Sequence, residues 1–273
     1  MSIAFTRHPA LVAYLTCGDP DVRTTRDVAL AAIDAGAEVI ELGVPFSDPV
    51  ADGPVIQRAS ERALRNGVTL EQVLKLAQDI RRESDAGLIV FSYLNPVMRM
   101  GLQRFVDQAA HAGVHGALIT DLPVEEADEY LRDMRQRNLA TVFLAAPTST
   151  DQRLKRIAEA STGFVYAISR TGITGQRKDL TEDARKLVNR LRKFTDLPIA
   201  VGFGIASPEH FATVAKFADA AAVGSAIVQT IQQNPGKEPQ AVAEFIKQLS
   251  AISHQPSAIR KVSTHVGRVA GAD

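Results

Sequence analysis

The stretch LQRFVDQAAHAGVHGALITDLPVEEADEYLRDMRQRNLATVFLA, residues 102–145, contains the same pattern twice. Residues 102–112 have apolar positions at helical spacing, and they precede a short apolar run at residues 116–121 that is typical of a buried strand. Residues 125–137 and 140–145 repeat this order. Alternating helices and short buried strands are the pattern of βαβ units, which predicts a parallel sheet.

The same alternation extends in both directions along the chain. Eight apolar runs are predicted as strands: Ala10–Thr16, Glu38–Gly43, Leu88–Tyr93, Gly116–Asp121, Ala140–Ala145, Phe164–Ser169, Pro198–Gly202 and Ala220–Gly224. Helices are predicted between them over Thr24–Ala35, Leu102–Ala112, Glu125–Arg137, Asp151–Glu159, Thr181–Phe194 and Pro208–Phe217. Eight successive right-handed crossovers bring the last strand beside the first, so the prediction within the α/β class is a closed (β/α)8 TIM barrel. The alternative is an open doubly wound sheet, but the turn after the first strand lacks the glycine spacing of a dinucleotide-binding fold.

The domain prediction is one barrel over residues 1–250, with residues 251–273 as a flexible C-terminal tail. A chain of 273 residues with 45% hydrophobic composition can bury such a core in a single domain. The gap between the second and third predicted strands is the longest, which predicts an additional loop and helix after strand 2. The tail shows little helical or strand pattern, and such chain ends are commonly poorly ordered.

The overall composition excludes several classes of protein. The 31 basic and 31 acidic residues cancel, so no net field attracts nucleic acid or an anionic membrane. No stretch approaches the roughly 20 apolar residues of a membrane span, and the N-terminus does not resemble a signal peptide, so we expect a cytoplasmic protein. The single cysteine, Cys17, cannot form an internal disulfide. His111 and His115 are separated by Gly113, which is expected to end a helix, so we predict no metal site.

Glu41 is a candidate acid–base residue because of its position in the predicted strand 38–43. Side chains alternate along a strand, so Ile40 and Leu42 are expected to face the helices while Glu41 points into the barrel. Removal from water raises the pKa of a carboxyl group and suits it to proton transfer near neutral pH. A structural carboxylate paired with an arginine or lysine fits the placement equally well.

The loop that follows, residues 45–54, contains three prolines and two aspartates, Asp48 and Asp52. In barrels of this class the reaction takes place at the carboxyl ends of the strands, where such loops lie. Asp52 is therefore a candidate to extend over the barrel mouth and form a carboxylate pair with Glu41. The alternative is that both aspartates only form local turns with the backbone.

Glycines follow the last three predicted strands, in residues 169–175, 202–205 and 224–227. Backbone N–H groups in such loops, together with a short helix beginning at Ser225, form the usual phosphate site of these barrels. A single glycine can serve any tight turn, but three such loops at one end predict a phosphate ester as the substrate. A local site of this kind lets a protein without net charge bind an anion.

The motif ELGVPFSDPVADGP at residues 41–54 resembles the signature of tryptophan synthase α subunits. Further segments resemble that family in the same order, within residues 10–232: YLTCGDPD, TDLPVEEA, YAISRTGITG, VGFGIASPE and AVGSAIV. The resemblance implies a carbon–carbon lyase that needs no cofactor and cleaves indole-3-glycerol phosphate to indole and glyceraldehyde 3-phosphate by a retro-aldol reaction. Tyr14 departs from the family pattern, since many relatives have Phe there, and the residues beyond Gln233 match no family segment.

The resemblance also implies roles for residues of this sequence. Glu41 would protonate the indole ring at C3 and then act as the base at the substrate hydroxyl, while Asp52 would bind the indole N–H. Two carboxyl groups in different environments can divide such roles. Thr174 would orient Asp52 when the loop after strand 6 closes. The remaining implied roles are phosphate binding by Gly175, Gly204, Gly224 and Ser225, and lining of the substrate cleft by Tyr166 and Phe203.

The partner that the resemblance implies is a tryptophan synthase β subunit, which carries pyridoxal phosphate, in an α2β2 heterotetramer for tryptophan biosynthesis. Indole would pass to the β subunit, and residues 45–49, including Asp48, would lie near the interface. Three alternatives remain open: a free-standing indole-3-glycerol phosphate lyase, an activating partner with little turnover, and another phosphate-binding barrel such as a sugar-phosphate isomerase.

Overall fold

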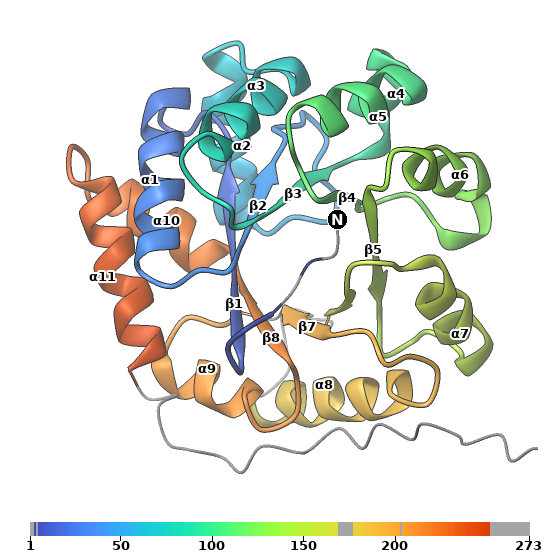
Figure 1. Cartoon of the computed structure of the whole chain (residues 1–273). Coiled ribbons are helices and arrows are strands. Elements are labelled where there is room, and N and C mark those ends of the chain that lie inside the picture. Colours follow the sequence, from blue (N-terminus) through green and yellow to red (C-terminus); the bar gives the residue numbers. More distant parts are fainter. Residues whose placement is uncertain (1–2, 4, 169–176, 203, 252–273) are drawn as a thin grey trace, which may run out of the picture.

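The computed structural model describes residues 3, 5–168, 177–202 and 204–251 of the chain. Eight parallel strands form a closed barrel (Figure 1). The strands are β1 (Ala10–Thr16), β2 (Val39–Gly43), β3 (Gly87–Ser92), β4 (Gly116–Ile119), β5 (Ala140–Ala145), β6 (Val165–Ile168), β7 (Ile199–Gly202) and β8 (Ala220–Val223). Pairing of Ala10 in β1 with Ala220 in β8 closes the sheet. The prediction of a (β/α)8 TIM barrel is therefore confirmed.

Helices form the layer outside the barrel (Figure 1). They are α1 (Val22–Asp34), α2 (Pro54–Arg65), α3 (Leu70–Arg81), α4 (Leu94–Met100), α5 (Leu102–His111), η1 (Val124–Glu126), α6 (Asp128–Gln136), α7 (Asp151–Ala160), α8 (Arg177–Leu191), α9 (Pro208–Val214), α10 (Ser225–Gln233) and α11 (Glu238–Ser250). Both α2 and α3 lie between β2 and β3. Two helices therefore occupy the interval where an additional loop and helix were predicted.

Some predicted boundaries differ from the observed ones. The predicted helix over residues 125–137 is divided into the 3₁₀ turn η1 and α6, because the backbone at Ala127 (φ −92°, ψ 4°) leaves the helical region between them. The predicted strand over residues 116–121 ends at Ile119, because the chain turns there and the backbone N–H of Leu122 bonds to the Ile119 carbonyl. Helix α11 is absent from the predicted elements; its buried side chains pack it against α1 and α10.

The hydrophobic core has two layers, one between the strands and the helices and one inside the barrel. Ile40 and Leu42 of β2 belong to the outer layer, whereas Val39 belongs to the inner layer. Since successive side chains of a strand point to opposite faces, this alternation places Glu41 inside the barrel. Its side chain is completely buried there.

The N-terminal segment closes the barrel at the amino ends of the strands. Phe5 packs on Phe164 with the ring centroids 5.7 Å apart. The carboxylate of Glu38 holds this segment, since it accepts hydrogen bonds from the Thr6 hydroxyl at 2.8 Å and from the Arg7 backbone N–H at 3.0 Å. Apolar side chains therefore fill this end of the barrel, and polar inward-facing side chains lie toward the other end.

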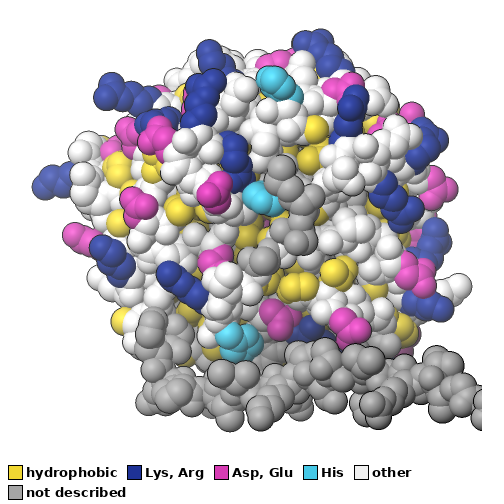
Figure 2. All heavy atoms as spheres, in the orientation of Figure 1, with side chains coloured by type: hydrophobic (Ala, Val, Ile, Leu, Met, Phe, Trp, Pro, Cys, Tyr) yellow, Lys and Arg dark blue, Asp and Glu magenta, His cyan; other side chains and the backbone are white. Residues whose placement is uncertain are grey.

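The surface carries charges of both signs. Basic and acidic side chains are interspersed over the face shown in Figure 2, in agreement with a formal net charge of zero. None of the helices in the described part of the chain is both long enough and apolar enough to cross a membrane.

Candidate active site

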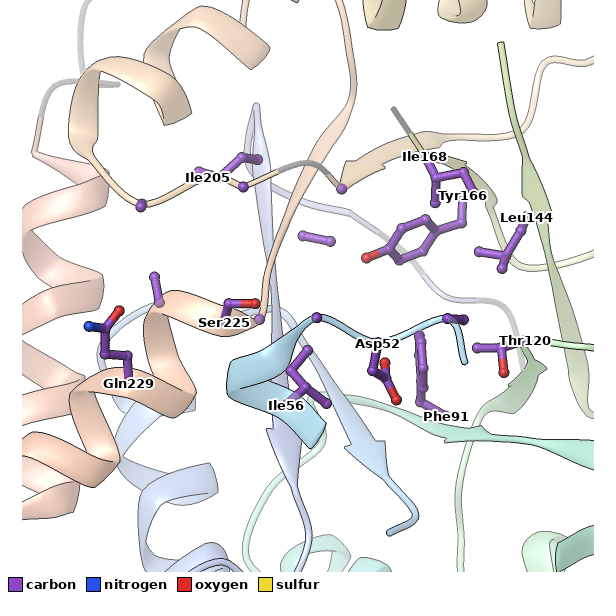
Figure 3. Close-up of a pocket in the computed structure, with 18 residues that line it drawn as sticks. Asp52, Ile56, Phe91, Thr120, Leu144, Tyr166, Ile168, Ile205, Ser225 and Gln229 are labelled. Atoms are coloured by element: carbon purple, nitrogen blue, oxygen red, sulfur yellow. The ribbon is translucent and has the colours of Figure 1, made fainter. Parts of the chain in front are cut away.

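A cavity of about 480 Å³ opens at the carboxyl ends of the strands (Figure 3). Phe91 of β3, Leu144 of β5 and Tyr166 of β6 form part of its wall, Asp52 enters from the loop after β2, and Ser225 contributes from the start of α10. The wall is mostly apolar and a few polar groups converge on the space, which is the usual composition of a small-molecule site. The position also matches that of active sites in barrels of this class.

Glu41 lies in the middle of β2, below the cavity, and is completely buried. Neither carboxyl oxygen has a hydrogen-bond partner among the described residues. Burial away from water disfavours the charged form and raises the pKa of Glu41 to about 8. Glu41 is therefore a neutral acid at pH 7, with a proton available for transfer. No arginine or lysine within the described part of the chain pairs with Glu41, which argues against a purely structural carboxylate.

Asp52 occupies a different environment in the wall of the cavity. The Tyr93 hydroxyl donates a hydrogen bond to Asp52 Oδ2 at 3.1 Å, and Tyr93 itself accepts one from the Ala51 backbone N–H at 3.0 Å. Burial raises the pKa of Asp52 to about 6, and the hydrogen bond from Tyr93 partly opposes that rise. Asp52 is mostly a carboxylate at pH 7, so the two acidic groups of the site differ in charge.

This difference allows two carboxyl groups to perform different chemistry. A neutral Glu41 can donate a proton, whereas an anionic Asp52 can stabilise positive charge or accept a hydrogen bond from an N–H group. The described residues place Asp52 in the cavity wall and Glu41 beneath it, rather than in a directly hydrogen-bonded carboxylate pair.

The alternative for Asp48 and Asp52 was that both aspartates only form local turns with the backbone. Asp48 is exposed, and its carboxylate accepts a hydrogen bond from the neighbouring Ser47 hydroxyl. The backbone makes local turns through Val50 N–H to the Asp48 carbonyl and through Asp52 N–H to the Pro49 carbonyl. The side chain of Asp52 takes no part in these turns and bonds to Tyr93 across the loop instead.

The same cavity is lined by three of the residues predicted to bind phosphate. Gly204, Gly224 and Ser225 all line it, and Ser225 is the first residue of α10. The first N–H groups of a helix lack partners within the helix and attract anions. Gly204 has φ +44°, a backbone conformation that favours glycine. This part of the cavity is thus suited to an anionic group of the ligand.

Tyr166 directs its hydroxyl into the cavity, with Ser225 and Asp52 on the other walls (Figure 3). Its ring lies over Gly202, where an added Cβ atom would stand 2.5 Å from the tyrosine oxygen. A larger residue at 202 would therefore displace this side chain. The predicted site residues Thr174, Gly175 and Phe203 lie outside the residues that the structure describes.

The sequence of the chain is similar to those of one known protein family. The family model described as "Tryptophan synthase alpha chain" matches residues 3–256. The chain belongs to the tryptophan synthase alpha chain family. The alpha chain of Solibacter usitatus is 54% identical over 225 residues, which is 82% of this chain and 84% of that protein. The alpha chain of Neisseria meningitidis serogroup B is 45% identical over 241 residues, or 88% and 92% of the two chains.

Solved structures of tryptophan synthase have the same fold. A chain of the Mycobacterium tuberculosis enzyme superposes with a TM-score of 0.84 at 36% identity, covering 91% of this chain and 94% of that one. A chain of the tryptophan synthase complex from Pyrococcus furiosus gives a TM-score of 0.82 at 37% identity, covering 89% and 98%. Membership of the tryptophan synthase alpha chain family rules out the alternative of a sugar-phosphate isomerase barrel.

Within this family member, some residues of the site were not predicted from the sequence. Tyr93 is the most important of them, because it bonds to Asp52 and packs on Phe46 with the ring centroids 5.0 Å apart. Its position directly after a buried strand could have indicated a role in the site, because the ends of barrel strands carry functional side chains. The apolar wall residues that were also missed are Ile56, Phe91, Leu144 and Ile205.

The histidines take no part in a metal site within the described residues, where no group of three or more possible ligands occurs. His111 is exposed, whereas His115 is half-buried and lies 3.1 Å from the Arg81 guanidinium. His115 Nδ1 also accepts a hydrogen bond from the Leu88 backbone N–H at 3.2 Å. This histidine therefore connects neighbouring elements at the far end of the barrel from the cavity.

Proposed function

We propose that this chain is the α subunit of a tryptophan synthase and cleaves indole-3-glycerol phosphate to indole and glyceraldehyde 3-phosphate. The observation that carries the proposal is the arrangement of two acidic groups, with Asp52 in the cavity wall and Glu41 buried inside the barrel beneath it. Burial raises the pKa of Glu41 to about 8 and that of Asp52 to about 6. Membership of the tryptophan synthase alpha chain family supports the same reaction.

The first step is transfer of the Glu41 proton to C3 of the indole ring. The ring then carries positive charge at its N–H group, and the Asp52 carboxylate stabilises that charge. Glu41, now a carboxylate, takes the proton of the hydroxyl on the side-chain carbon bonded to C3. The bond between C3 and that carbon breaks, its electrons return to the ring, and the side chain leaves as an aldehyde. Glu41 regains its proton, so the step balances without a cofactor in this chain.

In this proposal the phosphate of the substrate binds where the loops after β6, β7 and β8 meet the cavity. Gly204, Gly224 and Ser225 supply backbone N–H groups and the start of α10, and Gly175 completes the set by its position in the family motif. In the same proposal, Tyr166 and Phe203 contact the indole, and Thr174 orients Asp52. Binding of both the phosphate and the indole aligns C3 with Glu41.

The product indole passes to a tryptophan synthase β subunit in an α2β2 assembly, and pyridoxal phosphate belongs to that partner. The solved relatives support this partner, since the structure from Pyrococcus furiosus is of a tryptophan synthase complex. The loop around Asp48 suits an interface, because Val50 is 85% exposed there and Met98 on the neighbouring α4 is 58% exposed.

The same proposal includes a cytoplasmic location. It also includes a barrel domain of residues 1–250 with a C-terminal tail of residues 251–273, of which residues 252–273 lie outside the described part of the chain.

The decisive experiment measures glyceraldehyde 3-phosphate released from indole-3-glycerol phosphate by the purified chain, alone and with a tryptophan synthase β subunit. Slow release alone and strong stimulation by β are expected. Fast release that β does not change would identify a free-standing lyase. Absence of release under both conditions would refute the proposed reaction and leave only an activating role.

A further inference from the structure

Tyr14 is a buried tyrosine that the proposed mechanism does not use. It lies on β1 directly opposite Glu41 of β2 in the parallel register. The outer neighbours Ala13 and Leu15 pack toward the helices, so the side chain of Tyr14 points into the barrel, where it is 6% exposed. Tyr14 and Glu41 therefore stand side by side on the inner face of the barrel.

The tyrosine ring leans toward the carboxyl end of β2. A Cβ atom added at Gly43 would lie 2.3 Å from the Tyr14 hydroxyl oxygen and 2.5 Å from the ring carbon that carries it. The hydroxyl thus occupies the space of the residue 43 side chain. That position is two residues beyond Glu41 on the same face of the strand, which corresponds to roughly 7 Å along β2. The hydroxyl lies on the cavity side of Glu41.

The neighbouring residues hold the ring in place. The Tyr14 ring meets the Phe91 ring edge-on, with the centroids 5.2 Å apart and an angle of 78° between the planes. Ala59 of α2 and Val228 of α10 pack against it in one small cluster. A ring held in this way keeps its hydroxyl in one place and loses little freedom when it forms a hydrogen bond.

Both acidic groups of the site, Asp52 and Glu41, act electrostatically on the Tyr14 hydroxyl. In decreasing order, the groups that act on Tyr14 are Asp52 of the loop after β2, the Thr16 hydroxyl on β1, Cys17 after β1 and Glu41 of β2. Glu41 and Tyr14 both act in turn on Tyr166 of β6. Burial keeps the Tyr14 pKa well above its ordinary value, so Tyr14 is a neutral donor throughout the working range. The carboxyl oxygens of Glu41, by contrast, have no donor within the described part of the chain.

We propose that Tyr14 is a positioning residue, which donates a hydrogen bond to the Glu41 carboxylate after Glu41 has given its proton to the substrate. This inference rests on the proposed function. The bond holds the carboxylate on the cavity side of the barrel, where it must take the hydroxyl proton of the substrate. Donation to the charged form also lowers the pKa of Glu41 relative to a site without the hydroxyl.

The test is Tyr14→Phe, which removes one oxygen and keeps the ring packing against Phe91. Cleavage is followed as kcat and KM across pH, and we expect a lower kcat with KM little changed. Activity requires protonated Glu41, so it falls as pH rises through the Glu41 pKa. This alkaline limb should move to higher pH by roughly one pH unit or more in the variant. An alkaline limb at the wild-type pH would refute the proposal.

The matched control is Tyr130→Phe. Tyr130 is also buried, but its hydroxyl donates to the Ala117 carbonyl at 3.0 Å in the outer layer, remote from the cavity. Loss of that bond affects stability and is expected to leave the pH profile unchanged. A shift of the alkaline limb in Tyr130→Phe equal to that in Tyr14→Phe would show a general packing effect and overturn the assigned role.

A second measurement separates this inference from the proposed function. The carboxyl C=O stretch of Glu41 is assigned by infrared difference between the wild type and Glu41→Gln, and it is titrated without substrate. The midpoint should be higher in Tyr14→Phe than in the wild type or Tyr130→Phe. Equal midpoints would refute the hydrogen bond. Failure of the wild type to cleave indole-3-glycerol phosphate would refute the function, and the infrared titration would still decide the Tyr14 contact.

Discussion

At the scale of single residues, the chemistry depends on the lack of hydrogen-bond partners for Glu41 among the described residues. A buried carboxyl group without a hydrogen-bond partner among the described residues is held mainly in its neutral form at pH 7. Glu41→Gln keeps the shape of the side chain and removes the proton that titrates. Cleavage should fall by roughly 10²–10⁴-fold while the far-UV circular dichroism is unchanged. Wild-type turnover in this variant would contradict the proposed role.

The same substitution should change how stability depends on pH. Glu41 has a folded-state pKa of about 8, raised from 4.5, so the folded wild type binds more protons than the unfolded chain between these values. Wild-type stability should therefore fall as pH rises from 4.5 to 8, by about 5 kcal/mol at most from this group. Urea unfolding at several pH values should show a smaller decline in Glu41→Gln. Parallel declines would mean that Glu41 is not buried in its neutral form.

Tyr93 is predicted to control the ionisation of Asp52. Its hydrogen bond lowers the Asp52 pKa, so Tyr93→Phe should raise that pKa above about 6. Asp52 must be a carboxylate to stabilise the protonated ring, and activity therefore falls as pH decreases through its pKa. The acid limb of kcat/KM should move to higher pH in the variant, while the alkaline limb stays in place. An unmoved acid limb would assign Tyr93 to packing against Phe46 alone.

At the scale of elements, α2 sets the position of the loop that carries Asp52. Arg62 of α2 makes a two-point ion pair with Asp19 after β1, at 2.7 Å from Nε to Oδ1 and 2.8 Å from Nη2 to Oδ2. Asp19 is only 4% exposed, so loss of its partner leaves a buried charge without compensation. The ion pair thereby attaches α2 to the loop that follows β1.

Arg62→Met should therefore weaken both folding and substrate binding. We expect a loss of about 1–3 kcal/mol in the free energy of unfolding, a range reduced because Arg62 itself is 32% exposed. KM should rise more than kcat falls, since the loop of Asp52 loses its support. Arg65→Met, at an exposed position three residues later on the same helix, serves as the control and should change neither quantity. Equal effects of the two substitutions in unfolding and kinetic assays would refute this role of the ion pair.

At the scale of the whole molecule, residues from several strands meet at one cavity at the carboxyl ends, and apolar side chains fill the interior toward the other end. The proposed reaction needs Asp52 charged and Glu41 neutral at the same time. We therefore expect a bell-shaped pH profile of kcat/KM, with an acid limb near 6 and an alkaline limb near 8. Measurement of kcat/KM from pH 5 to 9 tests this. A profile that is flat across neutral pH would be incompatible with the division of roles between the two carboxyl groups.

The sequence by itself was enough to predict the barrel, with an open sheet as the alternative, and the orientation of Glu41. Alternation along β2 separates Ile40 and Leu42 from Glu41, and that period of two follows from backbone geometry whatever the rest of the chain does. Successive right-handed crossovers then leave closure of the sheet as the consistent outcome. The motif at residues 41–54 identified the family before any contact was known.

Only the tertiary structure decided which groups act on each carboxyl. Tyr93 reaches Asp52 across 41 positions of sequence, and Tyr14 lies over Gly43 because β1 and β2 pair in one register. Helix α11 is likewise defined by its packing on α1 rather than by a motif. The physical reason is that pKa values and hydrogen bonds depend on distance and on exclusion of water, and both arise only when segments remote in sequence meet.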